Sequence, residues 1–370
     1  MSHRAFLHRI SAAAPDDVSG LAQAISDGRI RPEGIVAILG KTEGNGCVND
    51  FTRAFAVQSL QLELKRHLQG HQAEAVCCVM SGGTEGALAP HWLVLERREE
   101  AAGPAPALAI GRARTRDILP EELGRMAQVE AVAAGVQAAM ADAGITKVSD
   151  VHFVQIKCPL MTAARVAEAQ MRGQSVAIRD TLKSMGYSRG ASALGVGLAL
   201  GEIPTTALSD DVIVKDVTLF SGRASTSAGI ELMDHEIVVL GMSDQWSGPL
   251  AIDHAVMADA IDIEPVRAAL QRLGLAANGQ LSSDERGKLV ALLAKAEPST
   301  TGILRGYRHT MLDDSDISAT RHARAFVAGA LAGLVGHAEI FVSGGAEHQG
   351  PDGGGPVAVI VDRKGGISRD

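Results

Sequence analysis

Short apolar runs that end in lysine occur three times along the chain. Runs of about four to eight apolar residues are typical of strands that are buried on both faces of a sheet. The third run has a more helical pattern of apolar positions than the other two. The runs and their lysines are residues 35–40 before Lys41, 151–156 before Lys157 and 289–294 before Lys295.

Each run is followed by an arginine that opens a predicted helix of small residues, and then by a second apolar run that ends in a serine–glycine turn. The arginines are Arg53, Arg189 and Arg324. The second runs are 75–80, 212–220 and 338–342, and their turns begin at Ser81, Ser221 and Ser343. A further strand is predicted at 91–95, 235–240 and 357–361. We call the run that ends in lysine the lysine strand and the run that ends in the serine–glycine turn the serine strand. The order of lysine strand, helix with arginine and serine strand therefore holds three times.

This recurrence predicts three similar units, each containing both helices and strands. Neighbouring arginines lie 136 and 135 residues apart, which is far longer than the repeat of a solenoid protein, about 20–50 residues. We expect an α/β fold with unit A at 1–103, unit B at 112–249 and unit C at 255–370. Arranged with pseudo-threefold symmetry around one axis, the three units would bring their lysines, arginines and serines together in one central cleft.

Composition and charge exclude several classes of function. Aromatic residues make up 3% of the 370 residues and the net charge is −8, so neither stacking platforms nor a basic surface for nucleic acid is expected. No segment reaches the roughly 18 apolar residues of a membrane helix, and the N-terminus lacks a signal-peptide core. The four cysteines lack zinc spacing. We expect a cytoplasmic protein, without membrane contact, that takes a small polar ligand.

Lysine, arginine and serine at strand ends suit attack on an amide or imide carbonyl. A buried lysine near other cations loses its proton readily and can activate a serine nucleophile. Arginines and backbone N–H groups at a serine–glycine turn can stabilise the resulting oxyanion. A single lysine at a strand end is usually only a solvated terminus, so the hypothesis depends on the threefold recurrence. A ligand that fits such a site is itself small, polar and nearly threefold-symmetric.

Four segments of the chain resemble the cyanuric acid amidohydrolase/barbiturase family, and the resemblance extends over essentially the whole sequence. The segments are 41–46 (KTEGNG), 80–86 (MSGGTEG), 221–229 (SGRASTSAG) and 342–351 (VSGGAEHQGP). In that family three repeats of one α/β unit form a barrel whose active site lies on the pseudo-threefold axis. The resemblance implies hydrolysis of cyanuric acid, which has three equivalent carbonyls, to carboxybiuret, which then loses carbon dioxide to give biuret.

The resemblance also implies a role for individual residues. Ser227 is the implied nucleophile and Lys157 its general base, although the strand ends alone leave Ser221 as an alternative to Ser227. Arg321, one turn before Arg324, is expected to influence specificity. The implied substrate-binding residues are Arg53, Ser81, Gly82, Arg189, Ser227, Ala228, Arg324, Ser343 and Gly344, with Lys41 and Lys295 paired to Ser81 and Ser343.

A structural divalent cation, Mg²⁺ or Ca²⁺, and no organic cofactor are implied as well. The glycine-rich loop 344–355 allows backbone carbonyls to turn toward a hard cation, and oxygen ligands disfavour zinc. The implied ligands are Glu297, Ala346, Gln349, Gly350, Pro351 and Gly354. The family resemblance further implies a homotetramer.

Three alternatives to a cyanuric acid hydrolase stay open at this point. One is a barbiturase, which opens the ring of barbituric acid. Another, from a different class, is a non-catalytic binding protein for a small polar ring. A general serine–lysine amidase would need only one serine–lysine pair, and it leaves the threefold recurrence unexplained.

Overall fold

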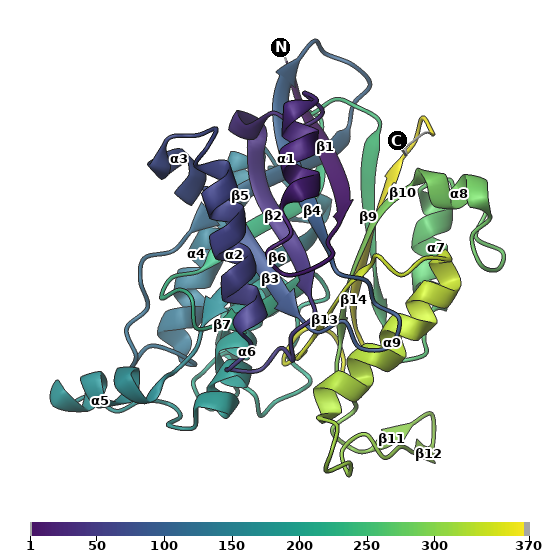
Figure 1. Cartoon of the computed structure of the whole chain (residues 1–370). Coiled ribbons are helices and arrows are strands. Elements are labelled where there is room, and N and C mark those ends of the chain that lie inside the picture. Colours follow the sequence, from purple (N-terminus) through teal and green to yellow (C-terminus); the bar gives the residue numbers. More distant parts are fainter. Residues whose placement is uncertain (1, 366–370) are drawn as a thin grey trace.

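Three consecutive stretches of the chain each fold into a four-stranded sheet with helices (Figure 1). The computed structural model describes residues 2–365. Unit A contains β1 (Ser2–Ser11), α1 (Ser19–Ser26), β2 (Ile35–Thr42), α2 (Phe51–Leu64), α3 (Gly70–Glu74), β3 (Cys77–Gly82) and β4 (His91–Glu100). Unit B contains β5 (Ala107–Arg114), α4 (Met126–Asp142), β6 (Val151–Pro159), α5 (Ala163–Met171), α6 (Thr181–Ala199), β7 (Ala224–Gly229) and β8 (Glu236–Ser243). Unit C contains β9 (Leu250–Met257), α7 (Glu264–Arg272), α8 (Ser283–Lys288), β10 (Leu289–Ala296), the small hairpin β11 (Ile303–Leu304) and β12 (Tyr307–Arg308), α9 (Ala319–Val335), β13 (Phe341–Gly344) and β14 (Gly355–Asp362).

The three sheets have one and the same topology. Their strand orders are β1-β4-β2-β3, β5-β8-β6-β7 and β9-β14-β10-β13. In each sheet the lysine strand pairs in parallel with the serine strand, and the last strand lies antiparallel between the first strand and the lysine strand. The repeated order means that the three lysine–serine strand pairs occupy equivalent places in the fold.

Over residues 2–365 the three four-stranded sheets remain separate rather than closing into one hydrogen-bonded barrel. One face of each sheet packs into a common central core, where Leu39 of β2, Phe153 of β6 and Leu293 of β10 are fully or almost fully buried together. Side-chain packing between sheets, rather than a continuous hydrogen-bond ladder, therefore gives the domain its barrel-like form. Strands β5 and β9 begin at residues 107 and 250, so units B and C start slightly before the boundaries that the sequence predicts.

Helices cover the outer faces of the sheets. In unit C, Leu292 packs in a second core with Val266 of α7 and Leu331 of α9, whereas its neighbour Leu293 faces the centre. Figure 1 shows α7 and α9, coloured green to yellow, along the outer side of β9, β10 and β14. Because β10 is buried on both faces, its residues do not alternate between polar and apolar. The helical interpretation of this run is therefore wrong, and it forms a strand.

Two other local predictions need correction. The apolar run 212–220 forms turns rather than a strand, and the serine strand of unit B is β7, which begins after Ser221. Arg189 does not open its helix but lies near the middle of α6, which begins at Thr181 because the side chain of Asp180 caps it by accepting from the Lys183 N–H. Within residues 2–365, no helix is both long and apolar enough to cross a membrane.

The common core predicts that shortening Phe153 will destabilise the whole protein. Phe153 is fully buried between the sheets, whereas Phe55 on α2 is 48% exposed. Phe153→Ala should lower the free energy of unfolding by about 3–5 kcal/mol because it leaves a cavity in the core. Phe55→Ala should change it by less than about 1 kcal/mol. Urea denaturation followed by circular dichroism measures both values, and equal losses would contradict a shared core at Phe153.

Candidate active site

The parallel strand pairs place each buried lysine directly opposite a serine. Lys41 is the register partner of Ser81, and Lys295 is the register partner of Ser343. In unit B the partner of Lys157 is Ser227. Ser221 lies outside β7 and forms an isolated bridge with Gln349 instead. Ser227, and not Ser221, therefore occupies the position equivalent to the serines of the other two units.

The three lysines connect the units in a closed cycle. Each Nζ donates to the backbone carbonyl that immediately precedes the serine of another unit. The Nζ···O distances are 2.8 Å from Lys41 to Val342, 2.8 Å from Lys295 to Thr226 and 3.0 Å from Lys157 to Met80. All three lysines are at most 1% exposed. Unit A therefore bonds to C, C to B and B to A.

The lysine–serine contacts are equivalent in units A and C but not in unit B. Lys41 Nζ lies 3.1 Å from Ser81 Oγ, and Lys295 Nζ lies 3.2 Å from Ser343 Oγ. Lys157 Nζ instead forms an ion pair with Glu231 at 2.7 Å. The Ser227 hydroxyl shares a hydrogen bond of 3.2 Å with the Ser343 hydroxyl. The threefold pattern is thus broken at Lys157.

Burial lowers the pKa of each of the three lysines, because the charged form loses its hydration. For Lys41 the pKa falls well below its usual range, and the charge of Arg324 adds to the effect of burial. Burial lowers the pKa of Lys295 to about 7, with a further contribution from Arg189. The pKa of Lys157 is also lowered by burial, but the Glu231 carboxylate opposes this shift. All three amines are therefore easier to deprotonate than a solvated lysine.

A small cavity lies where the three serine strands meet. Its lining contains one serine and one arginine from each unit, whereas the lysines lie behind the serines. Two lining residues, Gly46 and Met185, were not predicted from the sequence. The remaining lining residues are Arg53, Ser81, Gly82, Arg189, Ser227, Ala228, Arg324, Ser343 and Gly344.

Each arginine reaches from its own helix across the serine strand of another unit. Arg189 of α6 makes a bidentate ion pair with Glu347 at 2.7 and 2.6 Å. Arg324 of α9 makes the same pair with Glu85 at 2.6 and 2.5 Å. Arg53 of α2 instead donates to the carbonyls of Ala228 and Cys47, at 2.8 and 2.6 Å. The guanidinium groups are therefore held in fixed orientations around the cavity.

Sequence reasoning missed the glutamates, although they leave a signal. Glu85, Glu231 and Glu347 each stand four residues after the serine of their unit. Two of them hold an arginine of a neighbouring unit, whereas Glu231 holds Lys157. Their ion-pair partners come from distant parts of the chain. The four-residue spacing therefore shows that the glutamate recurs in each unit, but it does not show which side chain each glutamate pairs with.

Glycine is required where the arginines cross the serine–glycine turns. Gly83 has φ +106°, and a Cβ there would lie 2.0 Å from Arg324 Nη2. Gly345 has φ +80°, and a Cβ there would lie 2.5 Å from Arg189 Cζ. Any larger residue would therefore displace the guanidinium as well as strain the backbone.

Comparison with known proteins agrees with this geometry. The family model described as amidohydrolase ring-opening protein matches residues 6–362. The chain belongs to this family. It is 67% identical to a cyanuric acid amidohydrolase of Azorhizobium caulinodans, over 96% of this chain and 98% of that protein. It is 63% identical to a cyanuric acid amidohydrolase of a Bradyrhizobium species, over 97% of this chain and 98% of that protein.

Solved structures show the same architecture as this ring-opening amidohydrolase. The crystal structure of the cyanuric acid hydrolase from A. caulinodans superposes with a TM-score of 0.92 at 65% identity, covering 98% of this chain and 99% of that one. Another cyanuric acid hydrolase, described as an innovation by structural concatenation, gives a TM-score of 0.93 at 50% identity, covering 98% of this chain and all of that one. The predicted α/β fold of three similar units is confirmed.

Arg321 lies outside the central cavity. It lines a larger outer cavity that shares Gly46, Met185, Arg189, Arg324 and Gly344 with the central one. Arg321 therefore stands at the entrance to the site, one turn of α9 away from Arg324.

The candidate cation site of this amidohydrolase is a carboxylate-lined cavity beside the loop 344–355. Of the predicted ligands, Glu297, Ala346, Gly350 and Pro351 line it, whereas Gln349 and Gly354 do not. The Gln349 amide is already engaged: its Oε1 accepts from the Thr226 N–H at 2.7 Å. Burial raises the pKa of Glu297 to about 7, and the nearby Glu347 carboxylate adds to this rise. Glu297 and Glu347 are half-buried and line this cavity, and carboxylate oxygens are the ligands that a hard cation prefers.

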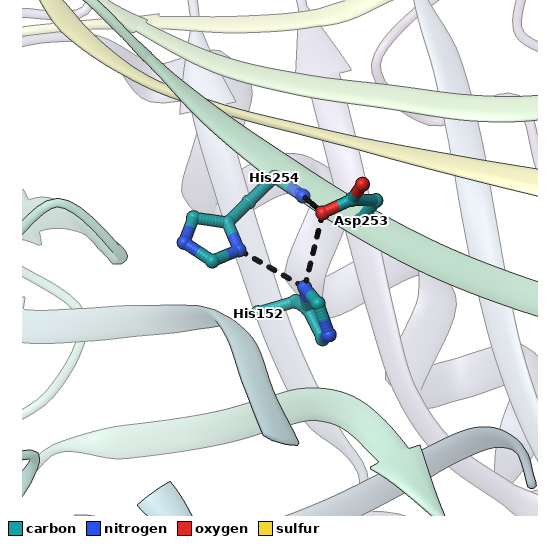
Figure 2. A group of neighbouring side chains, drawn as sticks. All are labelled: His152, Asp253 and His254. Carbon is teal, nitrogen blue, oxygen red and sulfur yellow. Dashed lines mark hydrogen bonds and ion pairs between the residues drawn. The ribbon is translucent and has the colours of Figure 1, made fainter. Parts of the chain in front are cut away.

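A separate cluster of polar side chains joins units B and C. His152 of β6 and His254 of β9 point toward each other with their Nδ1 atoms 2.9 Å apart, and Asp253 lies beside them (Figure 2). Burial lowers the pKa of both histidines, to about 4 for His254, so the imidazoles are neutral at pH 7. The Asp253 carboxylate already has an ion pair of 2.6 Å with Arg272, and Arg223 faces the histidines. We interpret the cluster as a hydrogen-bonded junction between the units.

Proposed function

We propose that this chain opens the ring of cyanuric acid by hydrolysis. The observation that carries the proposal is the small cavity to which each unit contributes one serine and one arginine. Cyanuric acid presents three equivalent carbonyls, so one arginine can face each of them. The names of the relatives support the same substrate. The immediate product is carboxybiuret, which loses carbon dioxide to give biuret.

In the mechanism that we propose, Ser227 is the nucleophile and Lys157 the general base. Lys157 lies opposite Ser227 in the strand register, and its lowered pKa makes the neutral amine accessible. Lys157 takes the hydroxyl proton as Ser227 Oγ attacks a ring carbonyl carbon. The ring C–N bond then breaks, and the ammonium of Lys157 returns the proton to the departing nitrogen. Water next cleaves the serine ester and releases the opened product.

The other two units bind the ring and do not react with it. The Ser81 and Ser343 hydroxyls each accept a hydrogen bond from their own lysine, whereas Ser227 Oγ shares its hydrogen bond with a neutral hydroxyl. A serine oxygen that already accepts from an amine has less electron density to offer a carbonyl. Arg53 donates to the Ala228 carbonyl next to Ser227, so its guanidinium is placed to stabilise negative charge at the attacked carbonyl.

We further propose that a divalent cation, Mg²⁺ or Ca²⁺, is held by Glu297 together with loop oxygens of Ala346, Gly350 and Pro351. When bound, it would offset the negative charge of the half-buried Glu297 and Glu347 carboxylates and hold the loop against β10. Glu297 follows Lys295 by two residues, so a cation at Glu297 would help to hold Lys295 and Ser343 in place. In this proposal the cation supports binding of the ring and takes no part in proton transfer. Gln349 and Gly354 have weaker support as ligands, because neither lines the cavity. The homotetramer stays a prediction.

Replacing the nucleophile tests the proposed reaction. Ser227→Ala should lower kcat for cyanuric acid by at least about 10³-fold, because no other oxygen occupies the attacking position. Ser221→Ala is the control from the same segment and should retain most of the activity, since Ser221 lies outside the strand pair. Loss of ring absorbance and formation of biuret measure both variants.

The same assay separates this function from its alternatives. An active Ser227→Ala protein would contradict the nucleophile assignment. Wild-type protein that consumes barbituric acid but not cyanuric acid would be a barbiturase. If the wild type consumed neither ring but bound cyanuric acid by calorimetry, the protein would be a binding protein.

Removing the cation should lower stability more than it changes the chemistry. Dialysis against a chelator should lower the midpoint of thermal unfolding, and Ca²⁺ or Mg²⁺ should restore it, because binding to the folded state stabilises it. Glu297→Gln should abolish this response to added cation. A midpoint that does not respond to chelator or cation in the wild type would contradict the site.

A further inference from the structure

Glu231 is the point at which the threefold pattern of the site is broken. Its counterparts Glu85 and Glu347 turn toward arginines, at 2.5 and 2.6 Å. Glu231 turns instead toward Lys157, with Oε1 2.7 Å from Nζ. Because the three glutamates occupy equivalent sequence positions, the difference is a property of unit B and not of the repeat.

A second cavity approaches Lys157 from the side away from the serines. Lys157 and Glu231 line it together with Glu236, Arg114, Cys78 and Glu74. Glu74 is exposed, so the cavity extends from the protein surface to the buried amine. Residues of the central cavity, including Ser227, do not line it. Lys157 therefore lies between the central site and a separate polar cavity.

The proposed reaction needs such a connection. Hydrolysis of a neutral ring to a product that leaves as a carboxylate releases one proton for each turnover. While the central cavity is filled by substrate or product, this proton cannot leave past the serines. A route through the lysine that receives the serine proton avoids the obstruction.

We propose that Glu231 passes protons between Lys157 and water in this second cavity, and that this makes Lys157 the catalytic lysine of the three. The proposal rests on the proposed function. In each turnover Lys157 Nζ gives the excess proton to a Glu231 carboxylate oxygen, and Glu231 releases it to water. Glu231 also holds the Lys157 ammonium in place, as the aspartate of a serine–histidine–aspartate triad holds its histidine.

Charged groups around the pair shift the pKa values of Lys157, of Glu231 and of a second carboxyl group, Glu236. Burial of Glu236 raises its pKa to about 7, so a second carboxyl group in the cavity can exchange protons near neutral pH. Lys157 and Arg53 hold the pKa of Glu231 below its usual value although burial opposes this, and the Glu231 carboxylate partly offsets the lowering of the Lys157 pKa by burial. The other groups that face this pair are Cys158, which acts on Lys157, and Arg165, which is affected by Glu231.

Chemical rescue distinguishes proton transfer from a purely structural role. Glu231→Ala should lower kcat for cyanuric acid by about 10²-fold or more, the contribution of a positioned acid–base group, with little change in KM. Added formate can enter the second cavity and should restore kcat in a saturable way. The matched control is Glu85→Ala, the equivalent position in unit A, which should raise KM through Arg324 and gain nothing from formate.

The pH profile gives an independent measurement on a variant that keeps the shape of the side chain. Glu231→Gln removes the charge that favours the ammonium of Lys157, so the acid limb of kcat should move to lower pH. Glu85→Gln should leave the acid limb in place. This pair of variants carries the test if Glu231→Ala does not fold.

Each result decides the proposal. Saturable rescue, or an acid limb moved to lower pH, supports it. Undiminished kcat in both Glu231 variants overturns it, and so does a loss of kcat without rescue and without a shift of the acid limb. In either case wild-type activity on cyanuric acid leaves the proposed function standing, whereas an inactive wild type rejects both.

Discussion

Three hydrogen bonds from buried lysines to carbonyls hold the site together. Lys41, Lys157 and Lys295 each donate to the residue before the serine of another unit. Each lysine also has a partner in its own unit, Ser81, Glu231 or Ser343, but an ammonium group has three donors, and a buried donor left without an acceptor costs about 1–3 kcal/mol. The carbonyls of the neighbouring units therefore complete the hydrogen bonding of the three lysines, and this favours the assembly of the repeats into one domain around one site.

Equivalent positions of the three units carry glutamates that have different partners. Repeated topology gives every unit a lysine, an arginine, a serine and a glutamate, in that order along the chain. The glutamates of units A and C hold arginines in position, and that of unit B holds a lysine. A nearly threefold-symmetric ring can thus be held equally on three sides while only one side has the charge arrangement for proton transfer.

The recurring residue types and most strands could be predicted from the sequence, whereas the contacts between units could not. The sequence shows Lys41, Arg53 and Ser81 as candidates because the same residue types recur in the same order in the other units, for example at Lys157, Arg189 and Ser343. The serine of unit B could not be placed from strand ends, because the apolar run 212–220 forms turns and the register with Lys157 becomes visible only in the folded sheet. The run at 289–294 looks helical because burial on both faces removes the polar alternation of a strand. Glu231 lies four residues after Ser227, as the other two glutamates lie after their serines, but its pairing with Lys157 is visible only in the folded structure.

A crystal structure of the Ser227→Ala protein with cyanuric acid tests the central claim most directly, because the ring would bind without being opened. The account predicts one ring in the central cavity, with its three carbonyls facing Arg53, Arg189 and Arg324 and one carbonyl carbon beside position 227. A ring bound outside this cavity, or held by the residues of a single unit, would contradict it.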